Sequence, residues 1–202
     1  MAKVVKFPGP APEKFGLQRV GKKQAKEKEP EKEKPNQLPL FTGGKVIKLS
    51  QLSTFEDALL QNENNNLKSA RELYLKAIEE GDNVADAYCN LGIIESEGDN
   101  HSKAIDCFTQ SLKADPRHYE AHYNLANLYA EVGNYSLAKF HYGISIEIEP
   151  NFPNSYFNLG ITLALNKEFD EAVKLLYSYR SLSSGEDLTY TDELIRQLTI
   201  VP

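Results

Sequence analysis

Three asparagines, Asn90, Asn124 and Asn158, recur at a constant spacing of 34 residues. A carboxamide side chain donates through its nitrogen and accepts through its oxygen, which are the two polar functions of a peptide backbone. A row of such side chains can therefore hold an extended peptide whatever its sequence. The same groups can instead join neighbouring helices to one another, and the sequence leaves both roles open.

The histidines offer a second kind of chemistry. His118 and His122 are four residues apart, a spacing that could bind a metal on one face of a helix. No cysteine or carboxylate stands at a supporting spacing, so we interpret His122 as a packing residue. His101 and His141 are isolated and are predicted to lie on the surface. The sequence also has no glycine-rich nucleotide loop and no nucleophile–base pattern, so we expect no enzyme activity, no catalytic residue, no metal and no cofactor.

Hydrophobic periodicity predicts the elements that carry these residues. Residues 119–152 are expected to form two amphipathic helices joined by a tight turn. Gly133 favours the left-handed backbone conformation at the end of the first helix, and Pro150 ends the second. The apolar residues that define the two helical faces are Leu125, Leu128, Tyr129 and Val132, then Leu137, Ala138, Phe140, Tyr142, Ile144 and Ile148.

The same helical hairpin recurs along the chain. Shifts of 34 residues align Leu91, Leu125 and Leu159, and likewise Ala104, Ala138 and Ala172. A fixed period of this length is typical of a stacked solenoid. We predict repeats at about 51–84, 85–118, 119–152 and 153–184, the first of them divergent. A short helix at about 189–199, with Leu194, Ile195 and Leu198 on one face, is expected to cap the exposed end.

The repeat resembles the tetratricopeptide repeat (TPR). One copy carries the bulky residue, Leu-Gly pair, turn, alanine, aromatic and closing proline of that family as Tyr88, Leu91, Gly92, Gly98, Asp99, Ala104, Phe108 and Pro116. The resemblance covers roughly two thirds of the chain. It implies an all-α, right-handed α-solenoid of about four helical hairpins, with a non-catalytic function as a scaffold or adaptor that binds other proteins.

In such a stack, the first helix of each hairpin lines a concave groove. The predicted groove residues are the three asparagines, their neighbours in register and acidic residues at the edges: Asp86, Cys89, Asn90, Ile93, Glu97, Glu120, Tyr123, Asn124, Asn127, Glu131, Phe157, Asn158 and Ile161. Chaperone-binding members of the family clamp a C-terminal carboxylate here with lysines and arginines. This chain has aromatic, aliphatic or acidic residues instead. The resemblance therefore argues against a carboxylate ligand and favours a peptide with basic and apolar residues.

Charge divides the chain into two parts. Residues 1–50 contain 12 Lys and Arg against 5 Asp and Glu, a net charge of +7, whereas residues 51–202 contain 11 against 24, a net charge of −13. The first part is rich in proline, lysine and glutamate and is predicted to be a disordered arm. The second part is the predicted TPR domain. We expect the tethered arm to visit the acidic groove, and a free solubilising tail is the alternative.

The remaining expectations concern location and partners. No apolar run is long enough for a membrane span or a secretory signal, so we expect a cytoplasmic protein with Cys89 and Cys107 reduced. A protein or peptide is the expected partner, and no membrane is. An alternative is a transcription-regulator-associated or nucleic-acid-linked adaptor that acts through the basic arm, although glutamates between its lysines weaken phosphate binding. An accessory subunit of an enzyme is a third class, and the oligomeric state stays open.

Overall fold

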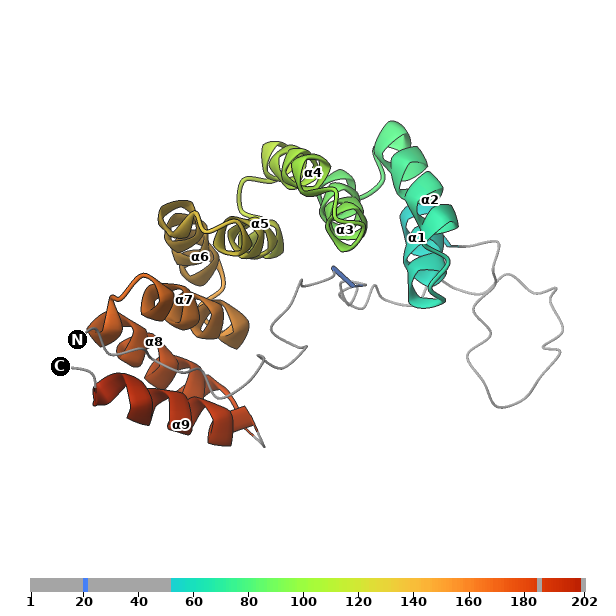
Figure 1. The fold of residues 1–202 in the computed structure, drawn as a ribbon. Coiled ribbons are helices and arrows are strands. Elements are labelled where there is room, and N and C mark those ends of the chain that lie inside the picture. Colours follow the sequence, from blue (N-terminus) through green and yellow to red (C-terminus); the bar gives the residue numbers. More distant parts are fainter. Residues whose placement is uncertain (1–19, 22–51, 185–186, 201–202) are drawn as a thin grey trace, which may run out of the picture. The chain divides into compact units, whose positions relative to one another are not determined.

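A computed structural model describes residues 20–21, 52–184 and 187–200. These residues form α-helices and no strand, which confirms the predicted all-α class (Figure 1). They divide into two units, one with α1 and α2 and the other with α3 to α9 and Val20. The predicted arm lies outside the described residues except for Val20 and Gly21. The helices are α1 (Thr54–Glu63), α2 (Leu67–Glu80), α3 (Val84–Glu97), α4 (His101–Ala114), α5 (Tyr119–Glu131), α6 (Tyr135–Ile148), α7 (Pro153–Leu165), α8 (Phe169–Leu182) and α9 (Asp187–Thr199).

The first unit is the hairpin of α1 and α2. The Ser53 side chain accepts from the backbone amide of Glu56, and the Glu56 carboxylate accepts from the backbone amide of Ser53, so the capping box typical of a helix start is present. The carboxylate of Asp82 accepts from the backbone amide of Phe55 at 2.8 Å. The Phe55 ring packs on Tyr74 with a centroid distance of 5.9 Å. These contacts close a hairpin whose first helix departs from the repeat pattern.

The second unit packs its helices in chain order (Figure 1). The hairpins α3–α4, α5–α6 and α7–α8 pack one on the next, with α4 in contact with α5 and α6 in contact with α7. The first helices of consecutive hairpins also touch, α3 with α5 and α5 with α7. The last helix, α9, packs on α8 and buries Leu194, Ile195 and Leu198, the face predicted from the sequence.

The 34-residue period is present in the backbone as well as in the sequence. The residue that follows each turn donates its amide to a carbonyl five positions earlier, the arrangement that ends many helices. The turn residue itself has a positive φ in all four hairpins: 59° at Asn65, 60° at Asp99, 77° at Gly133 and 66° at Lys167. The α1–α2 hairpin therefore has the same turn as the others, and a glycine occupies the turn position in just one of the four.

The second helices of the three hairpins in the second unit bury the same positions. Gly92 and Gly160 on the first helices allow close approach, because a Cβ at Gly92 would lie 2.7 Å from the Phe108 ring and one at Gly160 would lie 3.0 Å from the Leu176 side chain. These small residues therefore mark the close contacts between helices. The buried positions are Ala104, Phe108 and Ser111 in α4, Ala138, Tyr142 and Ser145 in α6, and Ala172, Leu176 and Tyr179 in α8.

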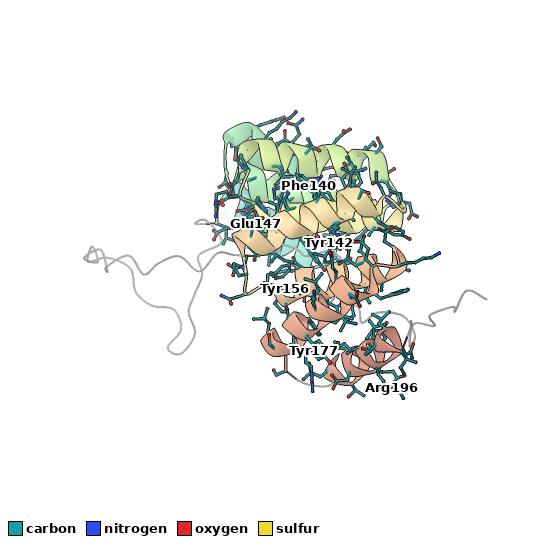
Figure 2. The ribbon with its side chains drawn as sticks, turned by 90° about the vertical axis from the view of Figure 1, so that its left-hand side faces the viewer. Phe140, Tyr142, Glu147, Tyr156, Tyr177 and Arg196 are labelled. Atoms are coloured by element: carbon teal, nitrogen blue, oxygen red, sulfur yellow. The ribbon has the colours of Figure 1, made fainter. Side chains whose placement is uncertain are left out.

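Three residues predicted to lie on apolar faces are exposed instead. Phe140 is 60% exposed, Val132 is 57% exposed and Leu137 is 39% exposed. Because α6 buries Ala138 and Tyr142, Phe140, midway between them in the sequence, projects from the other side of the helix (Figure 2). Val132 is the C-cap of α5 and lies just beyond its last helical turn. The apolar face of each helix is therefore narrower than its composition suggests.

None of the described helices has both the length and the apolar character needed to cross a bilayer.

Candidate functional site

The predicted groove residues lie on the first helices of the hairpins, α3, α5 and α7. Glu97 and Glu131 are exposed. Four are partly buried, namely Glu120, Asn127, Asn158 and Ile161. The buried members are Asp86, Cys89, Asn90, Ile93, Tyr123, Asn124 and Phe157. Most of the predicted groove residues are therefore buried or partly buried, and the exposed ones are carboxylates.

Asn90 on α3 holds a residue from the N-terminal part of the chain. Its Oδ1 accepts from the backbone amide of Val20 at 3.0 Å, and its Nδ2 donates to the Val20 carbonyl oxygen at 3.0 Å. Asn90 is fully buried and Val20 is 3% exposed. Residues 20–21 are the short blue segment of Figure 1. One carboxamide thus satisfies both polar groups of one residue's backbone, which is the chemistry predicted for the asparagines.

The Val20 side chain packs into an apolar cluster formed by α3, α4 and α5. Its members are Cys89, Ile93, Ala104, Phe108, Ala121, Leu125 and Leu128. Burial raises the pKa of the Cys89 thiol far above its usual value, so this cysteine is uncharged and serves as part of the apolar wall. Full burial of a valine contributes roughly 1.5–3 kcal/mol. We call Asn90 and this cluster the Asn90 subsite.

The other two asparagines join neighbouring helices. Nδ2 of Asn124 donates to Sγ of Cys89 at 3.5 Å. Nδ2 of Asn158 donates to Oη of Tyr123 at 2.9 Å and to Oδ1 of Asn127 at 2.8 Å. Cys89 and Tyr123 each stand 35 positions before the asparagine that donates to them, on the preceding first helix. The helix-joining role left open by the sequence therefore applies to these two positions.

The described hydrogen bonds of Asn90 are of another kind than those of its two counterparts. Its carboxamide pairs instead with the backbone of Val20.

The aromatic residues next to the asparagines pack against second helices and loops. The Tyr123 ring meets the Phe152 ring at a centroid distance of 5.1 Å, and the Phe157 ring meets the Tyr179 ring at 5.1 Å. Burial raises the pKa of the Tyr123 phenol, so it is uncharged near neutral pH. Both rings contribute to the buried core of α5 to α9.

A histidine begins α5 and ties it to α3. Nδ1 of His118 accepts from the backbone amide of Ala121 at 3.1 Å, so the ring proton lies on Nε2. Nε2 is 2.9 Å from Oδ1 of Asp86, and Nδ1 is 3.3 Å from Oε2 of Glu120. Asp86, assigned by sequence to an edge of the groove, is buried and pairs with His118. The sequence did not predict this pair, because its members come from different hairpins.

The prediction that His141 is an isolated surface residue is wrong. Its Nδ1 lies 2.9 Å from Nδ1 of His122, and its ring stacks on Tyr129 with a centroid distance of 5.6 Å. Burial, assisted by the nearby His122, lowers the pKa of His141 to about 4. Burial also lowers the pKa of His122. The described residues contain no group of three or more side chains able to hold a metal ion.

The tetratricopeptide repeat family matches residues 85–118, 107–140 and 141–174. Residues 85–174 of the chain are therefore tetratricopeptide repeats. The match at 85–118 starts at the beginning of α3, the first helix of a hairpin. The other two matches start inside α4 and α6, so each covers one 34-residue repeat counted from the second helix of a hairpin. No curated protein matches the sequence.

Solved TPR structures share the fold. The TPR2B domain of yeast Sti1, in a complex with pHsp70, is 20% identical, with a TM-score of 0.54 over 57% of this chain and 95% of the domain. MamA is 17% identical, with a TM-score of 0.58 over 70% of this chain and 90% of its own. The first TPR of Spaghetti (RPAP3), bound to the HSP90 peptide SRMEEVD, is 18% identical, with a TM-score of 0.54 over 57% of this chain and 90% of its own.

Proposed function

We propose that this TPR protein is a non-catalytic scaffold that binds an extended segment of a partner protein along α3, α5 and α7. The pairing of Asn90 with the backbone of Val20 carries the proposal. Because every peptide has the same backbone, a carboxamide in this position gives affinity without regard to sequence. The apolar cluster beside it then gives selectivity for an aliphatic side chain.

Two structural neighbours support a peptide ligand. The Sti1 domain is in a complex with pHsp70, and the Spaghetti domain is bound to the HSP90 peptide SRMEEVD, which ends in acidic residues. The predicted groove of this chain has no lysine or arginine, and its charged members are all acidic. We therefore propose a ligand with basic and apolar residues instead of an acidic C-terminus.

We propose a cytoplasmic location, because Cys89 is a thiol buried in the apolar cluster, which fits a reducing compartment.

A screen of short random peptides tests the proposed function. The full-length chain is screened beside its Val20→Asp variant, because Val20 occupies the same subsite as the expected ligand. Enriched peptides are expected to share an aliphatic residue and basic neighbours. Asn90→Ala, made in the Val20→Asp chain, should weaken their binding about tenfold, since two hydrogen bonds of roughly 0.5–1.5 kcal/mol each are lost.

The matched control is Asn151→Ala, which changes an exposed asparagine in the loop before α7. This variant should bind the enriched peptides as the unaltered chain does. Failure to enrich any peptide family on either chain would show that the groove is not a peptide site. Affinity that ignores Asn90 would contradict the proposed binding mode.

A further inference from the structure

We infer that the segment around Val20 is a built-in competitor: it fills the Asn90 subsite within the same chain, and a partner must displace it with the same chemistry. That chemistry is an extended backbone with a small branched aliphatic residue and basic neighbours. The inference rests on the proposed function, because a competitor matters only where a partner uses the site.

The backbone pairing shows what a replacement ligand must supply. Asn90 is fully buried, and a buried carboxamide without partners costs roughly 1–3 kcal/mol. Val20 meets both of its polar atoms at 3.0 Å. A ligand that displaces Val20 must therefore present an amide and a carbonyl from one extended residue. A helical ligand has these groups bonded internally and does not meet that requirement.

The side-chain pocket narrows the ligand further. Val20 is buried among aliphatic and aromatic side chains of α3, α4 and α5, and Cys89 contributes an uncharged thiol. Extra volume in a closely packed cluster generally costs stability, and a charge there would be unpaired. A residue of about the size of valine is therefore the preferred anchor.

Charge explains why this part of the arm is suited to the subsite. Arg19 directly precedes Val20, and Lys22 and Lys23 follow after Gly21. The neighbouring helices α3 and α5 carry the acidic residues Asp86, Glu95, Glu97, Glu120 and Glu131. Opposite charges favour this segment over a neutral one and disfavour an acidic competitor.

Tethering sets the size of the expected effect. Two groups on one flexible chain meet at an effective concentration on the order of 1 mM. If the same segment in a separate peptide binds with a Kd of about 0.1 mM, the tethered copy weakens a competing ligand about tenfold. A partner with a modestly better anchor then still displaces the segment. The tethered segment therefore sets the minimum affinity that a partner needs in order to occupy the Asn90 subsite.

A titration with a synthetic fluorescent peptide of residues 13–26 tests the inference. Its affinity is measured by anisotropy for the full-length chain and for Val20→Asp and Val132→Asp. The last variant is a matched control, because Val132 is 57% exposed and undergoes the same chemical change. The peptide should bind the Val20→Asp chain about tenfold more tightly than the other two. Equal binding to all three chains, or binding to none, overturns the inference, while the random-peptide screen judges the proposed function separately.

Hydrogen exchange of the Val20 amide gives a second test that does not depend on the Val20 variant. The amide should be protected in the unaltered full-length chain. Asn90→Asp keeps the acceptor oxygen but replaces the Nδ2 donor with an oxygen facing the Val20 carbonyl, so protection should fall at least tenfold. An amide that exchanges freely in the unaltered chain contradicts the inference. Protection that rises with protein concentration, together with dimerisation in sedimentation, would place the segment in another copy and also overturn it.

Discussion

Nε2 of His118 lies 2.9 Å from Oδ1 of Asp86, and both side chains are buried. Asp86 belongs to the first turn of α3, and His118 is the N-cap of α5. The other ring nitrogen accepts from the amide of Ala121. One imidazole therefore accepts a hydrogen bond from a backbone amide in the first turn of α5 and also holds α5 against the preceding hairpin.

Replacing His118 should destabilise the fold. His118→Ala removes a helix cap and leaves a buried carboxylate without this donor, so we expect a loss of about 2–4 kcal/mol in the free energy of unfolding. His118→Asn is the control, since asparagine caps helices well but is too short to reach Asp86, and it should lose about half as much. Urea unfolding measures both. A urea midpoint for His118→Ala equal to that of the unaltered chain would show that the pair is dispensable.

Two glycines in helices should respond oppositely to the same substitution. In Gly92→Ala the new Cβ would lie 2.7 Å from the ring of Phe108, which is fully buried, so a loss of about 1–3 kcal/mol is expected. In Gly143→Ala the new Cβ meets nothing within 4 Å, so the better helix propensity should stabilise the protein by roughly 0.5–1 kcal/mol. Thermal melts compare the two variants. Equal shifts of Tm would contradict the close packing of α3 on α4.

Local patterns predicted most of the fold. The 34-residue period and the helix starts and ends depend on residues close in sequence, as at the Gly133 turn. Exposure within a helix was harder to predict. Phe140 lies on a helix with apolar residues on several sides, and composition does not say which side meets a neighbour. Only the packing of α6 through Ala138 and Tyr142 decides it.

The candidate site was predicted in part. The asparagine register located Asn90, and amide chemistry suggested its pairing with a backbone. The partner Val20 stands 70 positions away in a segment without a core-forming pattern, so nothing local indicated it. The contact between His122 and His141 was missed for the same reason, because the hairpin geometry brings α5 and α6 together.

The turn position offers a reciprocal exchange. Lys167 has a φ of 66° and Gly133 a φ of 77° at equivalent positions. A left-handed backbone costs a residue with a Cβ roughly 1 kcal/mol, which glycine does not pay. Lys167→Gly should therefore raise the free energy of unfolding by about that amount, and Gly133→Lys should lower it similarly. Urea titrations of the two variants measure the effect. The control is the double variant that carries both substitutions, in which the two changes in the free energy of unfolding should cancel. A change of the same sign in both would mean that the turns are not equivalent.

The histidine pair should make stability depend on pH. The pKa of His141 is lowered from 6.5 to about 4 in the folded protein, chiefly by burial. Between these values the unfolded state binds protons that the folded state does not, so stability should fall as the pH drops from 6.5 toward 4. Glu168 and Glu193, whose pKa values are lowered by hydrogen bonds from Lys139 and Arg196, lose charge below their usual 4.5 and so act at lower pH.

His141→Leu tests this dependence, because Leu175 occupies the equivalent position in the next hairpin. Urea midpoints of both chains are compared at about pH 7.5 and about pH 5. The variant should lose less stability than the unaltered chain on acidification. Some loss should remain, since burial lowers the pKa of His122 as well. Identical losses in the two chains would exclude His141 as the source.

The three asparagines should separate into two functional kinds. Asn158→Ala removes the donor to Tyr123 and Asn127, which join α7 to α5, and should lower the free energy of unfolding by about 1–3 kcal/mol. Asn90→Ala, made in the Val20→Asp chain, removes a side chain whose bonding partner is already displaced. Its effect on stability should stay within about 0.5 kcal/mol, while peptides selected on the Val20→Asp chain should bind about tenfold more weakly.

These two substitutions decide between a peptide ladder and a single peptide contact. If Asn158→Ala leaves stability unchanged and abolishes peptide binding, then Asn158 holds ligand backbone and its bonds to α5 are secondary. If Asn90→Ala in the Val20→Asp chain unfolds the protein and leaves the peptide affinity of the remaining folded fraction unchanged, Asn90 is a structural residue. Urea unfolding and peptide anisotropy, measured on the same samples, separate the outcomes. We expect stability to depend on Asn158 and recognition on Asn90, because the carboxamide of Asn90 pairs with the backbone of Val20, which lies outside the helical hairpins.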